Sequence, residues 1–156
     1  MQILIIGKEV GLAYLSQKFS THSIKSLPAG SAINAQQLQG MELVIDLEFD
    51  AHPQRMGMYA TLPECFFILH ANGLQLRETA AKLGIRMPLY NMAGINAWPG
   101  CLEAEPWEMS PGSELTPERL QPLAQALGFT YLLVADRVGL LTPRVIAMII
   151  NEAYFT

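Results

Sequence analysis

Five short apolar runs alternate with helix-forming stretches along this chain, and this alternation constrains its fold more than any other feature. Runs of four or five apolar residues are typical of strands buried on both faces of a parallel sheet. They lie at Ile3–Ile6, Leu43–Leu47, Cys65–Leu69, Met87–Tyr90 and Thr130–Val134, with a weaker one at His22–Ser26. Helices are expected at Val10–Phe19, Pro53–Thr61, Leu74–Leu83 and Thr116–Leu127. The pattern predicts an α/β domain, a mostly parallel sheet with helices on both faces.

The segment Asn91–Gly112 interrupts this alternation. It contains both tryptophans, Trp98 and Trp107, together with three prolines and three glycines, and it is predicted to be a long irregular loop. Loops of this length in a compact domain usually carry function. The tryptophans could therefore line a ligand pocket, or they could pack the loop onto the sheet.

Composition excludes several classes of function. The chain has 156 residues, enough for one domain, with 14 acidic and 10 basic residues and a net charge of −4. This charge offers no basic surface for nucleic acid or an anionic membrane, and no apolar run approaches the ~20 residues of a membrane span. Cys65 and Cys101 lack the spacing of metal ligands, and no signal peptide is apparent. A cytoplasmic protein without a metal site is expected.

The first predicted strand leads into the turn Gly7-Lys8-Glu9-Val10-Gly11, where a Rossmann domain binds pyrophosphate. Gly7 and Gly11 are therefore candidate cofactor-binding residues. The full fingerprint G-x-G-x-x-G is incomplete because its middle glycine is missing, and residues 20–41 contain no carboxylate to bind a ribose. The stretch 27–40 is also too short for a further strand and helix. The sequence predicts a reduced Rossmann-like domain, whose turn either binds NAD or is purely structural.

Polar residues follow two predicted strands at the sheet edge where α/β domains bind ligands. His70 and Asn72 come after Cys65–Leu69, while Glu48 lies between Asp46 and Asp50 after Leu43–Leu47. His70 is a candidate catalytic residue, and Glu48 and Asn72 are candidate cofactor-binding residues. The alternative is that they supply only turn chemistry.

The C-terminal segment predicts a helix that is apolar nearly all round. Thr142 is a suitable N-cap and Pro143 suits the first helical position. Val145, Ile146 and Ile149 are among the apolar residues that cannot all face one side, and such a helix must be covered. We expect a second copy to cover it, forming a homodimer through residues 142–155.

This segment also carries a family resemblance. Gly139–Ala153 resembles the 3-hydroxyacyl-CoA dehydrogenase family where its NAD-binding domain passes into its dimerisation domain. Met41–Leu47 and Trp107–Met109 are similar to two further segments of that family, in the same order. The resemblance implies a shortened, divergent 3-hydroxyacyl-CoA (3-hydroxybutyryl-CoA) dehydrogenase-like protein of fatty acid metabolism, with NAD as cofactor and an acyl-CoA ligand. It divides the chain into a Rossmann-like NAD-binding-type domain, 1–138, and the first helix of the dimerisation domain, 139–156.

The resemblance also assigns the active site. The family's catalytic histidine falls on Asn96, or on Pro88 in another alignment; its glutamate partner falls on Glu108, and its active-site asparagine on Pro143. An asparagine cannot accept a proton at neutral pH, and general-base assistance is worth ~10²–10⁴-fold in rate. The resemblance therefore implies weak or lost dehydrogenase activity. The alternatives are a non-catalytic dimeric binding module, or a fragment completed by another polypeptide.

Overall fold

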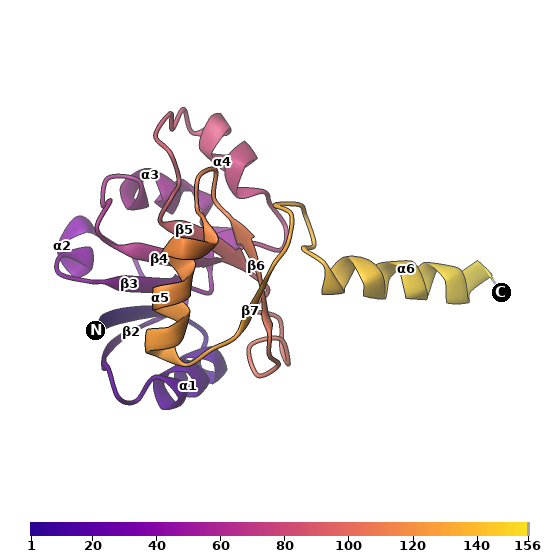
Figure 1. Cartoon of the computed structure of the whole chain (residues 1–156), viewed down its shortest axis with the longest axis horizontal. Helices are drawn as coiled ribbons and strands as arrows, with labels where there is room; N and C mark the ends of the chain where they lie inside the picture. Colours follow the sequence, from indigo (N-terminus) through magenta and orange to yellow (C-terminus); the bar gives the residue numbers. More distant parts are fainter. Residues whose placement is uncertain (156) are drawn as a thin grey trace.

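The computed structural model describes residues 1–155, which form a seven-stranded sheet with helices on both faces (Figure 1). The strand order is β2-β1-β3-β4-β5-β6-β7, and every neighbouring pair is parallel except β5 and β6. The predicted fold class is confirmed. The strands are β1 (Gln2–Gly7), β2 (Ser23–Pro28), β3 (Leu43–Asp46), β4 (Phe66–His70), β5 (Met92–Ile95), β6 (Trp107–Pro111) and β7 (Tyr131–Leu133).

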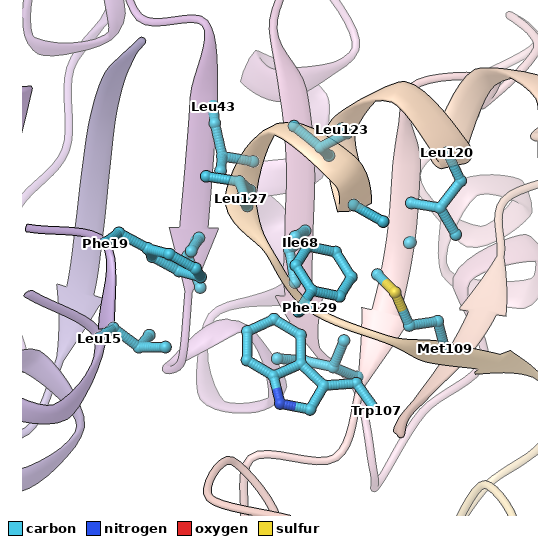
Figure 2. Packing of buried hydrophobic residues seen from close by; sticks show 14 of the residues in the cluster. Leu15, Phe19, Leu43, Ile68, Trp107, Met109, Leu120, Leu123, Leu127 and Phe129 are labelled. Carbon is cyan, nitrogen blue, oxygen red and sulfur yellow. The ribbon is translucent and has the colours of Figure 1, made fainter. Parts of the chain in front are cut away.

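The helices divide between the two faces because successive strand side chains point to opposite sides. One face packs against α1 and α5, and the other against α2, α3 and α4. Figure 2 shows the first of these layers, in which Leu120, Leu123 and Leu127 of α5 share one buried cluster with Ile68, Met109 and Trp107 of the sheet. The helices are α1 (Glu9–Lys18), α2 (Ala35–Leu38), α3 (Met56–Tyr59), α4 (Leu76–Lys82), α5 (Pro117–Leu127) and α6 (Thr142–Phe155), with 3-10 turns at Phe49–Ala51 and Pro53–Arg55.

The segment between β4 and β6 differs from the prediction. Met87–Tyr90 is not a strand, and β5 lies further along at Met92–Ile95, so the predicted loop Asn91–Gly112 contains both β5 and β6. The sequence of β5 includes Ala93 and Gly94 and gives a weak strand signal. Gly94 is nevertheless required, because a Cβ there would lie 2.5 Å from Ser110 Oγ on β6. Close packing between the two strands thus outweighs strand propensity.

The helix predicted at Pro53–Thr61 is also interrupted. A 3-10 turn over Pro53–Arg55 leads into α3, which spans only Met56–Tyr59. This geometry turns the side chains of Arg55 and Tyr59 inward onto Asp46 at the end of β3. The hydrogen bonds from Arg55 and Tyr59 to Asp46 therefore accompany the break in the predicted helix.

The connection from β2 to β3 contains only the four-residue helix α2, which begins with a capping box between Asn34 and Gln37. Among residues 1–155 there is thus no further strand beyond β2, as expected for a reduced Rossmann-like domain. Because β2 and β3 flank β1, the strand order reverses there. In the part of the chain that the structure describes, no helix is long and apolar enough to cross a membrane.

Helix α6 extends away from the sheet and its covering helices (Figure 1). Pro143 is its buried residue, whereas Met148, Ile149 and Ile150 are 62–67% exposed and Tyr154 and Phe155 are 84% and 78% exposed. The predicted apolar helix is therefore present, with its apolar surface facing solvent. The proposed division at 138/139 stays a prediction, and Thr156 lies outside the described residues.

Candidate functional site

A cavity of about 450 Å³ opens at the carboxyl ends of β1, β3, β4 and β5. Its wall comes from the β1–α1 turn, from residues that follow β3, from His70 and from residues 97–103 after β5. In open α/β sheets, ligands bind in the crevice where the strand order reverses, which here is between β1 and β3. Small-molecule sites have volumes of ~300–1,000 Å³. The cavity therefore has the position and size of a ligand site.

The structure brings together only some of the predicted site residues. Gly11, Glu48 and His70 line the cavity, and Gly7 lines a neighbouring hollow that shares Lys8 with it. Asn72, Asn96 and Glu108 belong to the same edge of the sheet, but other groups of the protein engage their side chains. All seven assignments stay predictions.

The two glycines of the β1–α1 turn are explained by packing. A Cβ on Gly11 would lie 2.6 Å from Leu47 Cδ1, and a Cβ on Gly7 would lie 3.0 Å from Leu47 Cβ. Leu47 follows β3 and lines the cavity. Glycine at these two positions therefore lets the turn approach Leu47. This packing accounts for both glycines without a bound phosphate.

His70 is engaged at both ring nitrogens. The backbone N–H of Ala97 donates to Nδ1 at 3.0 Å, which makes Nδ1 the unprotonated nitrogen. Nε2 lies 3.5 Å from Asp50 Oδ2, which also accepts the backbone N–H groups of Asn72 and Gly73 at 2.9 Å each. Nδ1 is therefore occupied by the Ala97 amide, and Nε2 faces the Asp50 carboxylate. His70 therefore joins the end of β4 to the segment after β5 and orients Asp50.

Asn96 fixes the start of that segment. Its Oδ1 accepts hydrogen bonds from Asn72 Nδ2 at 2.7 Å and from the Trp98 backbone N–H at 3.0 Å, and its Nδ2 donates to Cys101 Sγ at 3.2 Å. Asn96 and Asn72 are 6% and 5% exposed. Burial, followed by the nearby Glu108 and Glu103 carboxylates, raises the pKa of the Cys101 thiol. The asparagine side chain is thus committed to holding the loop.

The far end of the loop is anchored to α1 and β7. Lys18 Nζ donates to Glu105 Oε1 at 2.5 Å, and the backbone and hydroxyl of Thr130 donate to Oε2 at 2.9 and 2.8 Å. The hydrogen bond from Lys18, together with those from Thr130, lowers the pKa of the Glu105 carboxyl to about 2. Both ends of the cavity wall formed by residues 97–103 are therefore attached to the body of the domain.

Glu108 on β6 caps helix α6. Its carboxylate accepts the backbone N–H of Leu141 at 3.1 Å and that of Thr142 at 3.0 Å, and it accepts a short hydrogen bond from the Thr142 hydroxyl. A carboxylate at a helix N-terminus satisfies unpaired N–H groups and complements the helix dipole. The predicted cap Thr142 is thus itself held by Glu108.

Replacing Glu108 with alanine is expected to destabilise the start of α6 by about 1–2 kcal/mol, the cost of losing a helix cap. Hydrogen exchange of the amides of Leu141 and Thr142 should become faster, as measured by NMR. Glu103→Ala, at an exposed acid of the same loop, is the control and should leave this exchange unchanged. Unaltered exchange in Glu108→Ala would contradict the capping role.

Asp46, which the sequence placed among the acids after β3, is fully buried and forms a structural network. Arg55 Nη1 donates to both carboxylate oxygens at 3.1 and 3.0 Å, and the Tyr59 hydroxyl donates to Oδ2 at 2.7 Å. Burial and the neighbouring carboxylate raise the pKa of Tyr59, so the phenol stays protonated and donates. The network ties the residues after β3 to the connection that leads to β4.

The cavity wall also contains residues that the sequence did not mark as a site: Lys8, Ala97 and Glu103. Lys8 lies in the glycine turn, and Ala97 and Glu103 lie in the loop 91–112 whose length indicated a function, but no motif singled out these three side chains. Within residues 1–155 no group of three histidine, cysteine or acidic side chains could hold a metal ion, and neither cysteine is in a disulfide.

Neither a family profile nor a curated protein matches this chain. Solved structures do share its fold. (S)-3-Hydroxybutyryl-CoA dehydrogenase from Ralstonia eutropha has a TM-score of 0.73 at 10% identity, covering 98% of this chain and 70% of that one. A 3-hydroxyacyl-CoA dehydrogenase from Archaeoglobus fulgidus has a TM-score of 0.70 at 11% identity, covering 99% and 62%.

Other structures with this fold have different chemistry. An NAD+-dependent dismutase that acts as a 5-formyl-3-hydroxy-2-methylpyridine 4-carboxylic acid 5-dehydrogenase has a TM-score of 0.63 at 13% identity, covering 98% of this chain and 63% of that one. The TM-scores of 0.63–0.73 show a shared fold, and at identities of 10–13% they show the fold alone.

Proposed function

We propose that this chain is a 3-hydroxyacyl-CoA dehydrogenase-like domain that binds a nucleotide-type ligand, NAD or an acyl-CoA, and has weak or lost dehydrogenase activity. The observation that carries the proposal is the cavity at the reversal point of the strand order, between the β1–α1 turn and the residues after β3. The fold shared with a 3-hydroxybutyryl-CoA dehydrogenase and with an NAD+-dependent dismutase supports it. A cytoplasmic location and a role in fatty acid metabolism belong to the same proposal.

The residues present fit NAD only in part. The cavity and the neighbouring hollow lie on either side of Lys8, so the two ends of a dinucleotide could occupy them. The end of β2, however, offers Pro28 and Ala29 where a ribose-binding carboxylate would be expected. Without a carboxylate to bind the ribose, NAD is expected to bind weakly.

The side chains also explain why catalysis would be slow. Hydride transfer from a hydroxyl carbon needs a base to take the hydroxyl proton. Asn96 cannot do this, and Glu108 uses both carboxylate oxygens to hold α6. His70 has both nitrogens engaged. The geometry thus supports ligand binding better than rapid chemistry.

Purified protein at stoichiometric concentration, incubated with acetoacetyl-CoA and NADH, tests the enzymatic part. We expect slow or no loss of NADH absorbance. Calorimetric titration of NAD and of acetoacetyl-CoA tests the binding part, and we expect heat from at least one of them. Rapid turnover would contradict the proposed loss of activity, while binding of neither ligand would leave only the second function below.

The second candidate function is a non-catalytic dimeric module, and the exposed apolar surface of α6 favours it. Val145, Ile146, Met148, Ile149 and Ile150 are 45–67% exposed on a helix that stands apart from the domain. Burying such a side chain is worth ~1.5–3 kcal/mol. A second copy of the chain, related by a two-fold axis, would cover the same surface on both helices. A separate polypeptide that completes the domain would be an alternative occupant.

Ile149→Glu is expected to convert the dimer into monomer, because the charge would be buried in the helix pair. Analytical ultracentrifugation of the wild type and the variant measures this. Met87→Glu, which also replaces an exposed apolar side chain but lies far along the chain from α6, should stay dimeric. A wild-type monomer, or a dimer that survives Ile149→Glu, would contradict the proposed interface.

A further inference from the structure

The two tryptophans occupy opposite environments. Trp107 is 3% exposed and stacks on Phe129 with 4.7 Å between ring centroids, so it belongs to the core (Figure 2). Trp98 is 49% exposed and lines the cavity at the carboxyl ends of the strands. A large aromatic side chain left half in solvent at a cavity wall is available to contact a ligand.

The backbone that presents Trp98 is held firmly. Its own N–H donates to the buried Asn96 side chain at 3.0 Å, and the preceding N–H, of Ala97, donates to His70 Nδ1 at 3.0 Å. Binding therefore requires little ordering of this segment, and a preorganised aromatic face loses less entropy when a ring stacks on it.

The charge around the cavity is unbalanced. Lys8 is the cationic residue of the wall, whereas Glu48, Asp50 and Glu103 are carboxylic acids. Asp50 Oδ2 accepts the backbone N–H groups of Asn72 and Gly73, which fix the position of this carboxylate. The acids favour a cationic group inside this cavity, and a tryptophan face also attracts cations.

From these features we infer that the cavity selects a planar, positively charged nitrogen heterocycle, which stacks on Trp98 and is surrounded by Glu48, Asp50 and Glu103. The inference rests on the proposed function and adds to it a ligand class and a residue that determines specificity. An oxidised nicotinamide ring, which is a pyridinium, belongs to this class, as does a free pyridinium compound. A reduced, neutral nicotinamide ring lacks the charge and is bound less tightly.

The full chain is titrated with 1-methylnicotinamide and, separately, with neutral nicotinamide. Tryptophan fluorescence and calorimetry follow binding. We expect the cation to bind at least about fivefold more tightly and to quench the emission of the exposed Trp98. Equal affinities, or no binding of the cation at millimolar concentration, would overturn the inference. A parallel titration with NAD+ shows which ligand carries the heterocycle. If NAD+ binds more tightly than 1-methylnicotinamide, the ligand is a dinucleotide. If the two bind equally, the ligand is a free heterocycle.

Two variants test Trp98. Trp98→Leu keeps an apolar side chain but removes the ring, and should weaken binding of 1-methylnicotinamide about tenfold, equivalent to ~1.4 kcal/mol. Trp98→Phe, which keeps an aromatic ring, should retain most of the affinity for 1-methylnicotinamide. Tyr154→Leu removes an exposed aromatic outside the cavity and is the matched control. Circular dichroism confirms that each variant is folded.

Glu103→Gln should narrow the preference for the cation over nicotinamide, whereas Glu64→Gln, at an exposed acid elsewhere, should not. Failure of this inference is distinguishable from failure of the proposed function. If NAD or acetoacetyl-CoA binds while Trp98→Leu leaves its affinity unchanged and 1-methylnicotinamide does not bind, only the aromatic selectivity is wrong. If no ligand binds, both are wrong.

Discussion

Replacing Asp46 with alanine is expected to lower the free energy of unfolding by about 3–5 kcal/mol, the usual cost of removing one partner of a buried ion pair. The Arg55 guanidinium, 9% exposed, would keep its hydrogen bond to the Ser31 carbonyl but lose its counter-ion. The Tyr59 hydroxyl would lose its acceptor as well. Because small domains have only ~5–15 kcal/mol of stability, much of the total depends on this one carboxylate.

Urea denaturation followed by circular dichroism measures the change. Lys82→Ala provides the control, since its ammonium forms an exposed pair with Glu78 at 2.7 Å, and such pairs contribute less than ~0.5 kcal/mol. If Asp46→Ala and Lys82→Ala gave similar midpoints, the buried network would not be stabilising. The comparison separates two ion pairs of similar length that differ in burial.

Replacing Asn96 with alanine is expected to cost about 2–4 kcal/mol, since each buried polar group left without a partner costs ~1–3 kcal/mol. Asn72 Nδ2 and the Trp98 backbone N–H would both lose their acceptor. The segment 97–103 should then loosen at its start. We therefore also expect altered emission of Trp98 and weaker ligand binding in the cavity.

Ser110→Ala is the matched control for this variant. Ser110 Oγ is fully buried and has no hydrogen-bond partner among the described residues, so its removal should be neutral or slightly stabilising. Denaturation midpoints and the tryptophan emission maximum give the two measurements. An Asn96→Ala protein as stable as Ser110→Ala would rule out the positioning role of Asn96.

Local sequence pattern was enough to predict most of the fold. The runs Ile3–Ile6, Leu43–Leu47 and Cys65–Leu69 correspond to β1, β3 and β4, because a strand buried on both faces must be apolar throughout. The terminal helix was likewise predicted, with Thr142 at its start. β5 was misplaced because close contact with β6, rather than strand propensity, selects Gly94.

The site was less predictable, because the partners of each polar side chain are distant in the sequence. The sequence places His70 after a strand, but it does not show that Ala97 and Asp50 engage the two ring nitrogens. Glu108 looks like an active-site acid by resemblance, yet its carboxylate meets the N-terminus of α6, 34 residues further on. The sequence identifies the polar residues at the strand ends but does not determine which groups they hydrogen-bond.

By itself, then, the sequence determined the α/β class, the reduced strand set and the apolar C-terminal helix, since periodicity and length are local properties of the chain. The tertiary structure decided what the polar residues do. Strand order brought the β1–α1 turn and the segments after β3, β4 and β5 to one edge of the sheet, and there it made a cavity. Long-range hydrogen bonds at that edge committed Asn96 and Glu108 to holding the structure and left Trp98 on the cavity wall.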